Sequence, residues 1–197
     1  MKVLLLYLGS FLLGGVPFGY LVGKRLYSID IRSKGSGNIG ATNVLRTLGV
    51  LPGLIVLITD ILKGAIPVII GRSIGLSSEF YLLAGASSVL GHCFSPFLKF
   101  KGGKGVSSTF GMILAFDPLT AVLSFFVEVL FVAIWRYVSL GSIAAVIAMI
   151  IILYLRGYNL YVLLVGSLVA ILVIVRHREN IKRLREKREN KFTIGRH

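Results

Sequence analysis

Long apolar runs dominate the chain and restrict what it can fold into. Mean hydropathy is +0.85 and only 15% of the residues are charged, whereas soluble domains carry about 25%. A membrane-spanning helix needs about 20 apolar residues. The sequence therefore predicts an all-α polytopic membrane protein with about seven transmembrane or membrane-embedded helices, at about residues 3–23, 50–71, 80–97, 105–116, 118–135, 138–155 and 159–176.

A single domain, residues 1–197, is expected because only short polar segments separate these runs, and it ends in a basic tail at about 182–197. The fourth run, VSSTFGMILAF, is too short to cross alone and is expected to be a tucked or re-entrant helix buried by protein. The first run lacks a small-residue cleavage signal, so we interpret it as a retained helix rather than a signal peptide. One cysteine, Cys93, leaves no internal disulfide.

The distribution of cations predicts the orientation in the membrane. A net charge of +14 would indicate nucleic acid as a partner of a soluble protein. Here the cations cluster at the ends of the apolar runs, so the positive-inside rule explains them and no nucleic acid is expected. With the N-terminus outside, 18 of the 22 Lys and Arg face the cytoplasm, and only Lys2, Arg72 and Arg156 face outward. Five spans fit this division almost as well as seven, and both leave the C-terminus in the cytoplasm.

Three charged residues fall inside apolar runs, where each costs on the order of 3 kcal/mol at the helix centre. Asp60 and Lys63 are three positions apart, share one face of a helix and are expected to pair. Pro67 lies one turn later and can kink that helix. Glu128 has no obvious partner in its neighbourhood of the sequence.

The first of four polar clusters is SGNIGATNVLR, between the first two runs. Glycines let a backbone pass close to a ligand, and successive N–H groups can form a nest for an anion. Arg46 supplies a planar guanidinium suited to phosphate. A flexible linker is the alternative, but linkers seldom alternate Gly with Asn and Thr and then close on an Arg. The side chains able to bond a ligand or cap a helix are Ser36, Asn38, Thr42 and Asn43.

The second cluster is the glycine-rich turn KGGKG, residues 101–105, which opens onto an apolar helix whose N-terminus favours an anion. It lacks the spacing of a Walker A loop, so it does not indicate nucleotide hydrolysis. Lys104 is the expected phosphate ligand, with Ser107 and Ser108 in the first turn. An ordinary positive-inside loop with a helix cap is the alternative. His92 precedes the loop as either a buried structural histidine or a ligand.

Two weaker clusters follow. Ser139 and Ser142 open the sixth run, where capping of the helix explains them better than contact with a ligand. The segment RHRENIKRL places His177 and Asn180 three apart at the end of the last run, on one face if the helix continues. Binding of anionic lipid explains residues 182–197, but it does not explain this His and Asn.

The four clusters, which the orientation places on one membrane face, contain almost no carboxylates: Asp30 and Glu179 are all that lie near. A Mg²⁺-dependent phosphotransferase would need clustered Asp or Glu as ligands, so neither a metal nor a cofactor is expected. The chain also has no H-x-x-x-x-D pair, since Phe97 and Lys182 stand five residues after His92 and His177. The pattern indicates a site that holds phosphate beside lipid.

Taken together, SGNIGATNVLR, GHCFSPFLKFKGGKG and HREN resemble the motifs of the bacterial acyl-phosphate:glycerol-3-phosphate acyltransferases, the PlsY family. The resemblance covers residues 8–184 and shows no departure in the motifs. It implies a multi-pass enzyme of the bacterial inner membrane with its active site on the cytoplasmic face. Its substrates would be acyl phosphate and glycerol 3-phosphate beside membrane lipid, and its product lysophosphatidic acid. The chain offers no indication of protein partners.

The resemblance also implies roles for particular residues. Arg46 and Lys104 would clamp phosphates, and His177 and Asn180 would orient the glycerol. The catalytic residues would be Ser36, Arg46, Lys104 and His177. Those that bind substrate would be Gly37, Asn38, Gly40, Thr42, Asn43, His92, Gly102, Gly103, Gly105, Ser142 and Asn180, with no metal ligand among them.

The group that takes the proton from the attacking hydroxyl is open at this level. His177 has a suitable intrinsic pKa near 6.5, but its cationic neighbours should hold it neutral or occupied with phosphate. The departing phosphate can accept the proton instead, and we favour this substrate-assisted route.

Two alternatives come from other classes of protein. A secondary transporter of an organic phosphate would share the glycine-broken helices and buried charges of this chain. Its polar motifs, however, should gather near the membrane midplane and its two halves should repeat, whereas here the motifs gather at one face and no internal repeat pairs the halves. A non-catalytic scaffold that binds anionic lipid would leave the first two clusters without a purpose. A membrane enzyme is the better interpretation.

Overall fold

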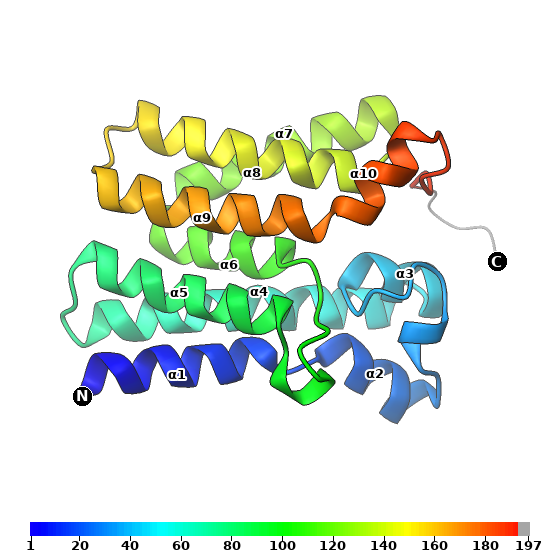
Figure 1. Cartoon of the computed structure of the whole chain (residues 1–197), viewed down its shortest axis with the longest axis horizontal. Coiled ribbons are helices and arrows are strands. Elements are labelled where there is room, and N and C mark those ends of the chain that lie inside the picture. The colour runs from blue at the N-terminus through cyan, green and yellow to red at the C-terminus, as the bar shows by residue number, and fades with distance from the viewer. Residues whose placement is uncertain (193–197) are drawn as a thin grey trace. The chain divides into compact units, whose positions relative to one another are not determined.

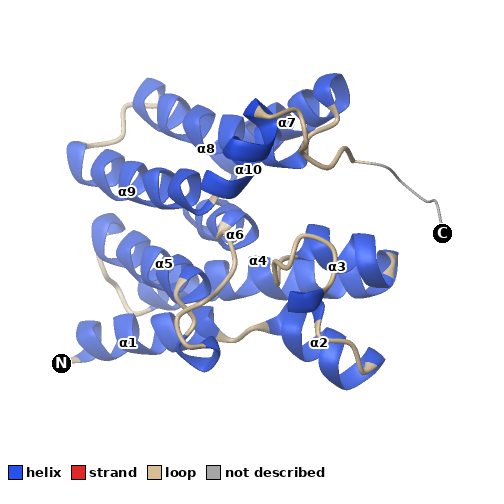
Figure 2. Ribbon diagram, turned by 45° about the vertical axis from the view of Figure 1, so that its right-hand side comes forward, coloured by secondary structure: helices blue, strands red, loops and turns tan. Residues whose placement is uncertain are grey.

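The computed structural model describes residues 1–192, in which helices are joined by loops and no strand is present (Figures 1 and 2). Two short 3₁₀ helices, η1 (Ile31–Ser33) and η2 (Pro96–Leu98), lie in the connections. The α-helices are α1 (Lys2–Gly15), α2 (Phe18–Tyr27), α3 (Ala41–Leu48), α4 (Val50–Ser73), α5 (Ser78–Cys93), α6 (Val106–Phe116), α7 (Pro118–Trp135), α8 (Val138–Leu155), α9 (Leu160–Arg176) and α10 (Arg178–Arg185).

Every predicted apolar run is helical, although the first is divided between two helices. Within residues 1–192, four segments are long and apolar enough to cross a membrane, and up to six are if each bent pair, α1 with α2 and α9 with α10, counts as one span. The run expected at 3–23 is not one helix, because Pro17 has no N–H to continue α1 and the chain bends by 40° there. The fourth run is the short helix α6, as predicted, and α4 is continuous through Pro67.

The chain divides into two compact units, residues 1–116 and the part from Asp117 onward. Each unit is described by itself, and the expectation of a single domain stays a prediction. The first unit contains α1 to α6 with the first two polar clusters, and the second contains α7 to α10 with the other two.

In the first unit, helices touch backbone to backbone at glycines. A Cβ on Gly64 of α4 would lie 2.0 Å from the carbonyl oxygen of Ser108 in α6, and one on Gly111 of α6 would lie 1.9 Å from that of Ile61. Gly14 and Gly91 make the same reciprocal contact between α1 and α5. Small residues allow this approach, which drives helix association where lipid tails remove the hydrophobic driving force.

A small apolar cluster joins the first two polar segments. It unites Ile31, Ile39 and Val44, which flank or belong to the first segment, with Leu98 of η2, just before the glycine turn. Val22 of α2 and Val56 of α4 complete it. Figure 1 shows α3 and the α5–α6 connection at the same end of this unit. Two segments about sixty residues apart in sequence therefore rest on one apolar base.

In the second unit, α7 and α8 form an antiparallel pair and α9 packs beside α8. At one end Arg156 donates to Asp117 at 2.7 Å and Thr120 donates to the same carboxylate at 2.6 Å. Burial alone would raise the pKa of Asp117, but these hydrogen bonds outweigh it and lower that pKa. Within α7, Glu128 has a partner that the sequence did not indicate, because Ser142 of α8 donates to it at 2.7 Å.

We expect Gly64→Ala to destabilise the first unit, because the new methyl would overlap a backbone carbonyl that cannot rotate away. The expected loss of unfolding free energy is about 2 kcal/mol or more. Gly9→Ala in α1 is the matched control, since a Cβ there meets nothing within 4 Å. Thermal unfolding of both variants in detergent tests this expectation, which fails if both variants have the same Tm as the parent protein.

Candidate active site

The first polar segment is held in shape by the side chain of Asn43 on α3. Its Oδ1 accepts the N–H of Ser36 at 2.8 Å. Its Nδ2 donates to the carbonyls of Ile31, Lys34 and Asn38 at 3.2, 3.1 and 2.8 Å. Asn43 is 2% exposed, so both ends of its amide are used by the loop. Its predicted contact with substrate stays a prediction, and its evident work is structural.

The rest of the segment turns around this amide. Asn38 Oδ1 accepts the N–H of Gly40 at 2.8 Å. Gly40 is the N-cap residue of α3, so this bond lies directly before the helix. Gly37 has φ +71°, a left-handed conformation that favours glycine. The loop thereby exposes the side chains of Ser36 and Thr42.

Two arginines near this loop differ in their partners. Arg32 donates to Asp30 at 2.6 Å and lies 4.5 Å from the ring of Tyr20. Its hydrogen bonds to the Asp30 carboxylate lower the pKa of Asp30 to about 2. Arg46 is half-buried and forms no ion pair with any residue in 1–192. It lies four positions after Thr42, on the same face of α3, so the two can act on one ligand.

The second polar segment is folded against the end of α5. Gly102 and Gly103 donate their N–H groups to the carbonyls of Cys93 and His92 at 3.2 and 3.0 Å. These two N–H groups therefore shape the loop rather than point at an anion. The donors that remain by helix geometry are the first-turn N–H groups of α6, which has Lys104 just before it.

The backbone of this segment is strained. Lys99 and Phe100 both have positive φ, 52° and 60°, which for residues with side chains costs about 1–3 kcal/mol each. Ser95 offsets this by accepting the N–H of Phe100 at 2.8 Å, while its own hydroxyl donates to Gly15 at 2.5 Å. Such strain persists only where neighbours over-determine the conformation.

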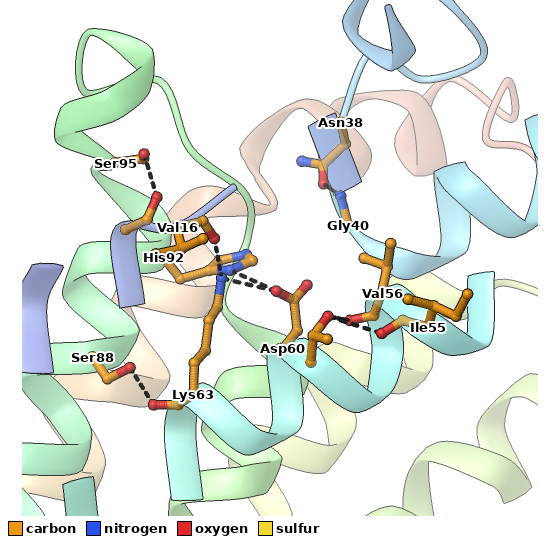
Figure 3. A network of polar contacts seen from close by, with 12 residues as sticks. Val16, Asn38, Gly40, Ile55, Val56, Asp60, Lys63, Ser88, His92 and Ser95 are labelled. Carbon is orange, nitrogen blue, oxygen red and sulfur yellow. Dashed lines mark hydrogen bonds and ion pairs between the residues drawn. The ribbon is translucent and has the colours of Figure 1, made fainter. Parts of the chain in front are cut away.

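The predicted Asp60–Lys63 pair is confirmed, with 2.8 Å between Nζ and Oδ1. His92 was expected to be either structural or a ligand, and its Nδ1 lies 3.7 Å from the same oxygen of Asp60. Lys63 also donates to the carbonyl of Val16 at 3.1 Å. Figure 3 shows these groups gathered at the break between α1 and α2. All three ionisable side chains are buried.

In the second unit, the expectation that Ser139 and Ser142 cap α8 is wrong. The N-cap is Tyr137 and has no side-chain cap. Ser139 instead donates to Glu189 at 2.9 Å, and Ser142 donates to Glu128. The reason is tertiary: neither serine stands at the N-cap position, and each hydroxyl donates to a carboxylate on another segment.

Glu189 gathers the third and fourth polar clusters. Its carboxylate accepts hydrogen bonds from Asn180 at 2.6 Å, Arg183 at 2.7 Å and Ser139. Burial would raise the pKa of Glu189, but these donors lower it. Sequence reasoning missed this residue, because it lies in the basic segment that was explained by lipid binding.

His177 lies at a bend rather than on a continuing helix. Helix α9 ends at Arg176, and α10 begins at Arg178 at an angle of 55°. His177 Nδ1 is 2.8 Å from the carbonyl of Val173, an acceptor. Nδ1 therefore carries a proton, and in the neutral form of the ring Nε2 would hold the lone pair. His177 and Asn180 are both buried.

The predicted site residues are thus collected in two groups. The first unit brings the segment around Asn43 together with the glycine turn, and the second brings Ser139 together with Asn180. No group of three or more His, Cys, Asp or Glu within residues 1–192 could hold a metal ion. The predicted convergence of all four clusters on substrate stays a prediction.

The apolar helices and the glycine-mediated helix contacts are those of an integral membrane protein. The sequence profile described as "Glycerol-3-phosphate acyltransferase" matches residues 4–187. The chain therefore belongs to the glycerol-3-phosphate acyltransferase family, a family of enzymes, as its motifs predicted.

Individual relatives agree with this assignment. The chain is 45% identical to the glycerol-3-phosphate acyltransferase of Trichlorobacter lovleyi over 184 residues, 93% of this chain and 94% of the relative. It is 45% identical to that of Aquifex aeolicus over 194 residues, 98% and 100% of the two chains.

Two solved structures are similar to this chain in both sequence and fold. The crystal structure of PlsY (YgiH), an integral membrane glycerol 3-phosphate acyltransferase in its glycerol 3-phosphate form, superposes with a TM-score of 0.93 at 43% identity, covering 98% of this chain and 96% of the other. Its lysophosphatidic acid form gives 0.91 at 42%, with the same coverage. The prediction of an all-α polytopic membrane protein is confirmed.

We expect Asn43→Asp to loosen the first polar segment, because a carboxylate cannot donate to the three carbonyls that Nδ2 now serves. Limited proteolysis should cut residues 31–40 faster in this variant than in the parent. Asn190→Asp makes the same chemical change at a position for which no hydrogen bond is observed, and it should leave that cleavage unchanged. Equal cleavage in all three proteins would contradict the role of Asn43.

Glu189 makes the packing of α10 depend on pH. Its pKa is lowered from 4.5 by folding, so its stabilising effect is complete above that value and is lost as the pH falls through the lower folded pKa. We expect hydrogen exchange in α10, corrected for intrinsic rates, to accelerate below about pH 4.5 and Glu189→Gln to be fast throughout. Glu186→Gln, which removes an exposed carboxylate paired with Arg188, should behave as the parent.

Proposed function

We propose that the protein transfers a fatty acyl group from acyl phosphate to the sn-1 hydroxyl of glycerol 3-phosphate, giving lysophosphatidic acid and inorganic phosphate. The family supports the acceptor and product, since its solved members have glycerol 3-phosphate and lysophosphatidic acid forms. The donor follows from the motif resemblance. One observation carries the proposal for this chain: the segment that ends in Arg46 and the glycine turn that contains Lys104 lie on one apolar cluster.

The proposed reaction needs no covalent intermediate with a protein side chain. The hydroxyl oxygen attacks the acyl carbonyl carbon, a tetrahedral intermediate forms, and the bond from that carbon to the phosphate oxygen breaks. The phosphate leaves, and the hydroxyl proton passes to an acceptor. Because the donor is a mixed anhydride with a good leaving group, positioning and electrostatic stabilisation can supply most of the rate.

The residues of the first unit would bind phosphate. Arg46 presents a guanidinium that no carboxylate in residues 1–192 engages, and Thr42 lies beside it on α3. Lys104 stands at the positive end of the α6 dipole. Ser36 would bond phosphate or a substrate hydroxyl. These cations and donors can neutralise phosphate charge directly, so we propose a reaction that needs no metal.

The residues of the second unit would orient the glycerol. Asn180 has its Nδ2 directed at Glu189, so its Oδ1 is the end of the amide that can accept a bond from a substrate hydroxyl. His177 could accept a proton at Nε2. We favour the departing phosphate as the proton acceptor, because its oxygens become basic as the anhydride bond breaks, at the place where the proton is released.

The location is proposed from charge. Nearly all Lys and Arg fall on one side of the predicted spans, and this supports a location of the polar clusters at the cytoplasmic face of a bacterial inner membrane. Acyl chains in the adjoining lipid would then reach the site from the bilayer.

The decisive assay uses purified protein in lipid, acyl phosphate, labelled glycerol 3-phosphate and a chelator. We expect lysophosphatidic acid to form, and Arg46→Ala to reduce kcat/KM by about 100-fold or more, because a charged phosphate ligand is lost. Arg32→Ala is the control, since Arg32 is already paired with Asp30, and it should stay within a few-fold of the parent. Absence of product, with uptake of glycerol 3-phosphate into liposomes, would indicate a transporter instead.

Two further variants separate the roles. Lys104→Ala should raise KM for a phosphorylated substrate, and an unchanged KM would refute the clamp. His177→Ala should keep near-normal turnover at saturating substrate if phosphate accepts the proton. A loss of turnover that is restored at higher pH by an added base would favour His177 as the acceptor.

A further inference from the structure

We propose that Asp60 and His92 are positioning residues for phosphate binding: they pack against the glycine-rich turn 101–105 and support its shape, and Lys63 balances the charge of Asp60. The inference rests on the proposed function, in which this turn and Lys104 receive a phosphate. It gives Asp60 and Lys63 an indirect part in substrate binding, although both are buried in α4, a helix long and apolar enough to cross a membrane.

The turn lies directly on His92. The carbonyl of His92 accepts the N–H of Gly103 at 3.0 Å. A Cβ on Gly103 would lie 2.1 Å from His92 Nε2, and one on Gly102 would lie 2.0 Å from the His92 carbonyl oxygen. Both the ring and the backbone of His92 therefore pack closely against the main chain of the turn.

The turn depends on outside support for its shape. Lys99 and Phe100 hold left-handed backbone conformations just before it, and Gly105 holds φ +86° at its end. A segment with this backbone relaxes when its neighbours withdraw. His92, Cys93 and Ser95 supply the hydrogen bonds that hold it.

The His92 ring lies in turn beside the Asp60 carboxylate. The carboxylate oxygen that Lys63 approaches at 2.8 Å also faces His92 Nδ1 at 3.7 Å. Figure 3 shows the Asp60 carboxylate directed at both groups. The three residues are each less than 5% exposed, so solvent screens their charges little.

Lys63 offsets the cost of burying the Asp60 carboxylate and connects the pair to the rest of the unit. An unpaired buried carboxylate would be costly, and the Lys63 ammonium neutralises Asp60 within one turn of α4. The ammonium also donates to Val16 in the α1–α2 break, and Ser88 of α5 donates to the Lys63 carbonyl at 2.6 Å. A line of contacts thus runs from α4 through His92 to the turn before Lys104.

The simpler alternative is a network that serves folding alone. It predicts that neutralising the pair lowers Tm without changing substrate binding. A positioning role predicts a specific rise in KM for the phosphorylated substrates in protein that remains folded, because misplacement of a binding loop by about 1 Å can cost on the order of 100-fold.

The test uses the full-length protein in lipid. Asp60→Asn combined with Lys63→Met removes both charges together and leaves no buried charge unpaired. His92→Ala removes the ring, and His92→Asn keeps a donor near the place of Nδ1. The readouts are kcat, KM for glycerol 3-phosphate and for acyl phosphate, and Tm.

We expect the double variant and His92→Ala to raise KM for at least one phosphorylated substrate by about 10- to 100-fold, with kcat changed less. His92→Asn should recover much of the loss. Asp117→Asn combined with Arg156→Met is the matched control, because it removes an ion pair of similar length in the other unit. It should lower Tm and leave KM unchanged.

Equal KM values in the parent and both His92 variants would overturn the inference, as would a double variant that only loses Tm. If both variants fail to fold, Gly103→Ala decides, since its methyl presses on the His92 ring: unchanged KM overturns the inference and raised KM supports it. A parent protein inactive with acyl phosphate would instead refute the proposed function, so the two failures are distinguishable.

Discussion

The buried ammonium of Lys63 is the interaction on which the first unit depends. Proline breaks the first apolar run, and the carbonyls at the end of α1 lose their helical partners there. Lys63 from α4 and Ser95 from the α5–α6 connection supply hydrogen bonds to Val16 and Gly15. Inside an apolar environment such groups must be satisfied by protein. The break is therefore stable, and it lets the chain leave the bundle as α2 and return through the first polar segment.

The two polar segments of this unit reach a defined shape by different means. The first is organised around one side chain, the Asn43 amide, which bonds four backbone groups of its own loop. The second is organised by backbone contact with the end of α5 and tolerates strain at Phe100. Both solutions leave a cation, Arg46 or Lys104, at the edge of a rigid loop. A rigid loop loses little entropy when it receives a small anion.

Pairing with carboxylates separates structural cations from those proposed to act on substrate. Arg32, Arg156 and Arg183 each engage a carboxylate on their own or a neighbouring segment. Arg46 engages none in residues 1–192. A carboxylate beside a phosphate ligand would both compete for the cation and repel the substrate. Under the proposed function, the scarcity of acidic residues around the glycine-rich segments would serve phosphate binding. Asp30, Asp117 and Glu189, by contrast, are each paired with an arginine.

The sequence by itself determined the apolar helices, the short α6, the Asp60–Lys63 pair and the family motifs, because each depends on residues close together in the chain. It could not determine that Asn43 serves its own loop, that Ser139 and Asn180 meet at Glu189, or that His92 lies under Gly103. These contacts join residues far apart or depend on which way a loop turns. Only the tertiary structure decided them, because a polar group finds its partner by position in space, and local pattern does not encode that position.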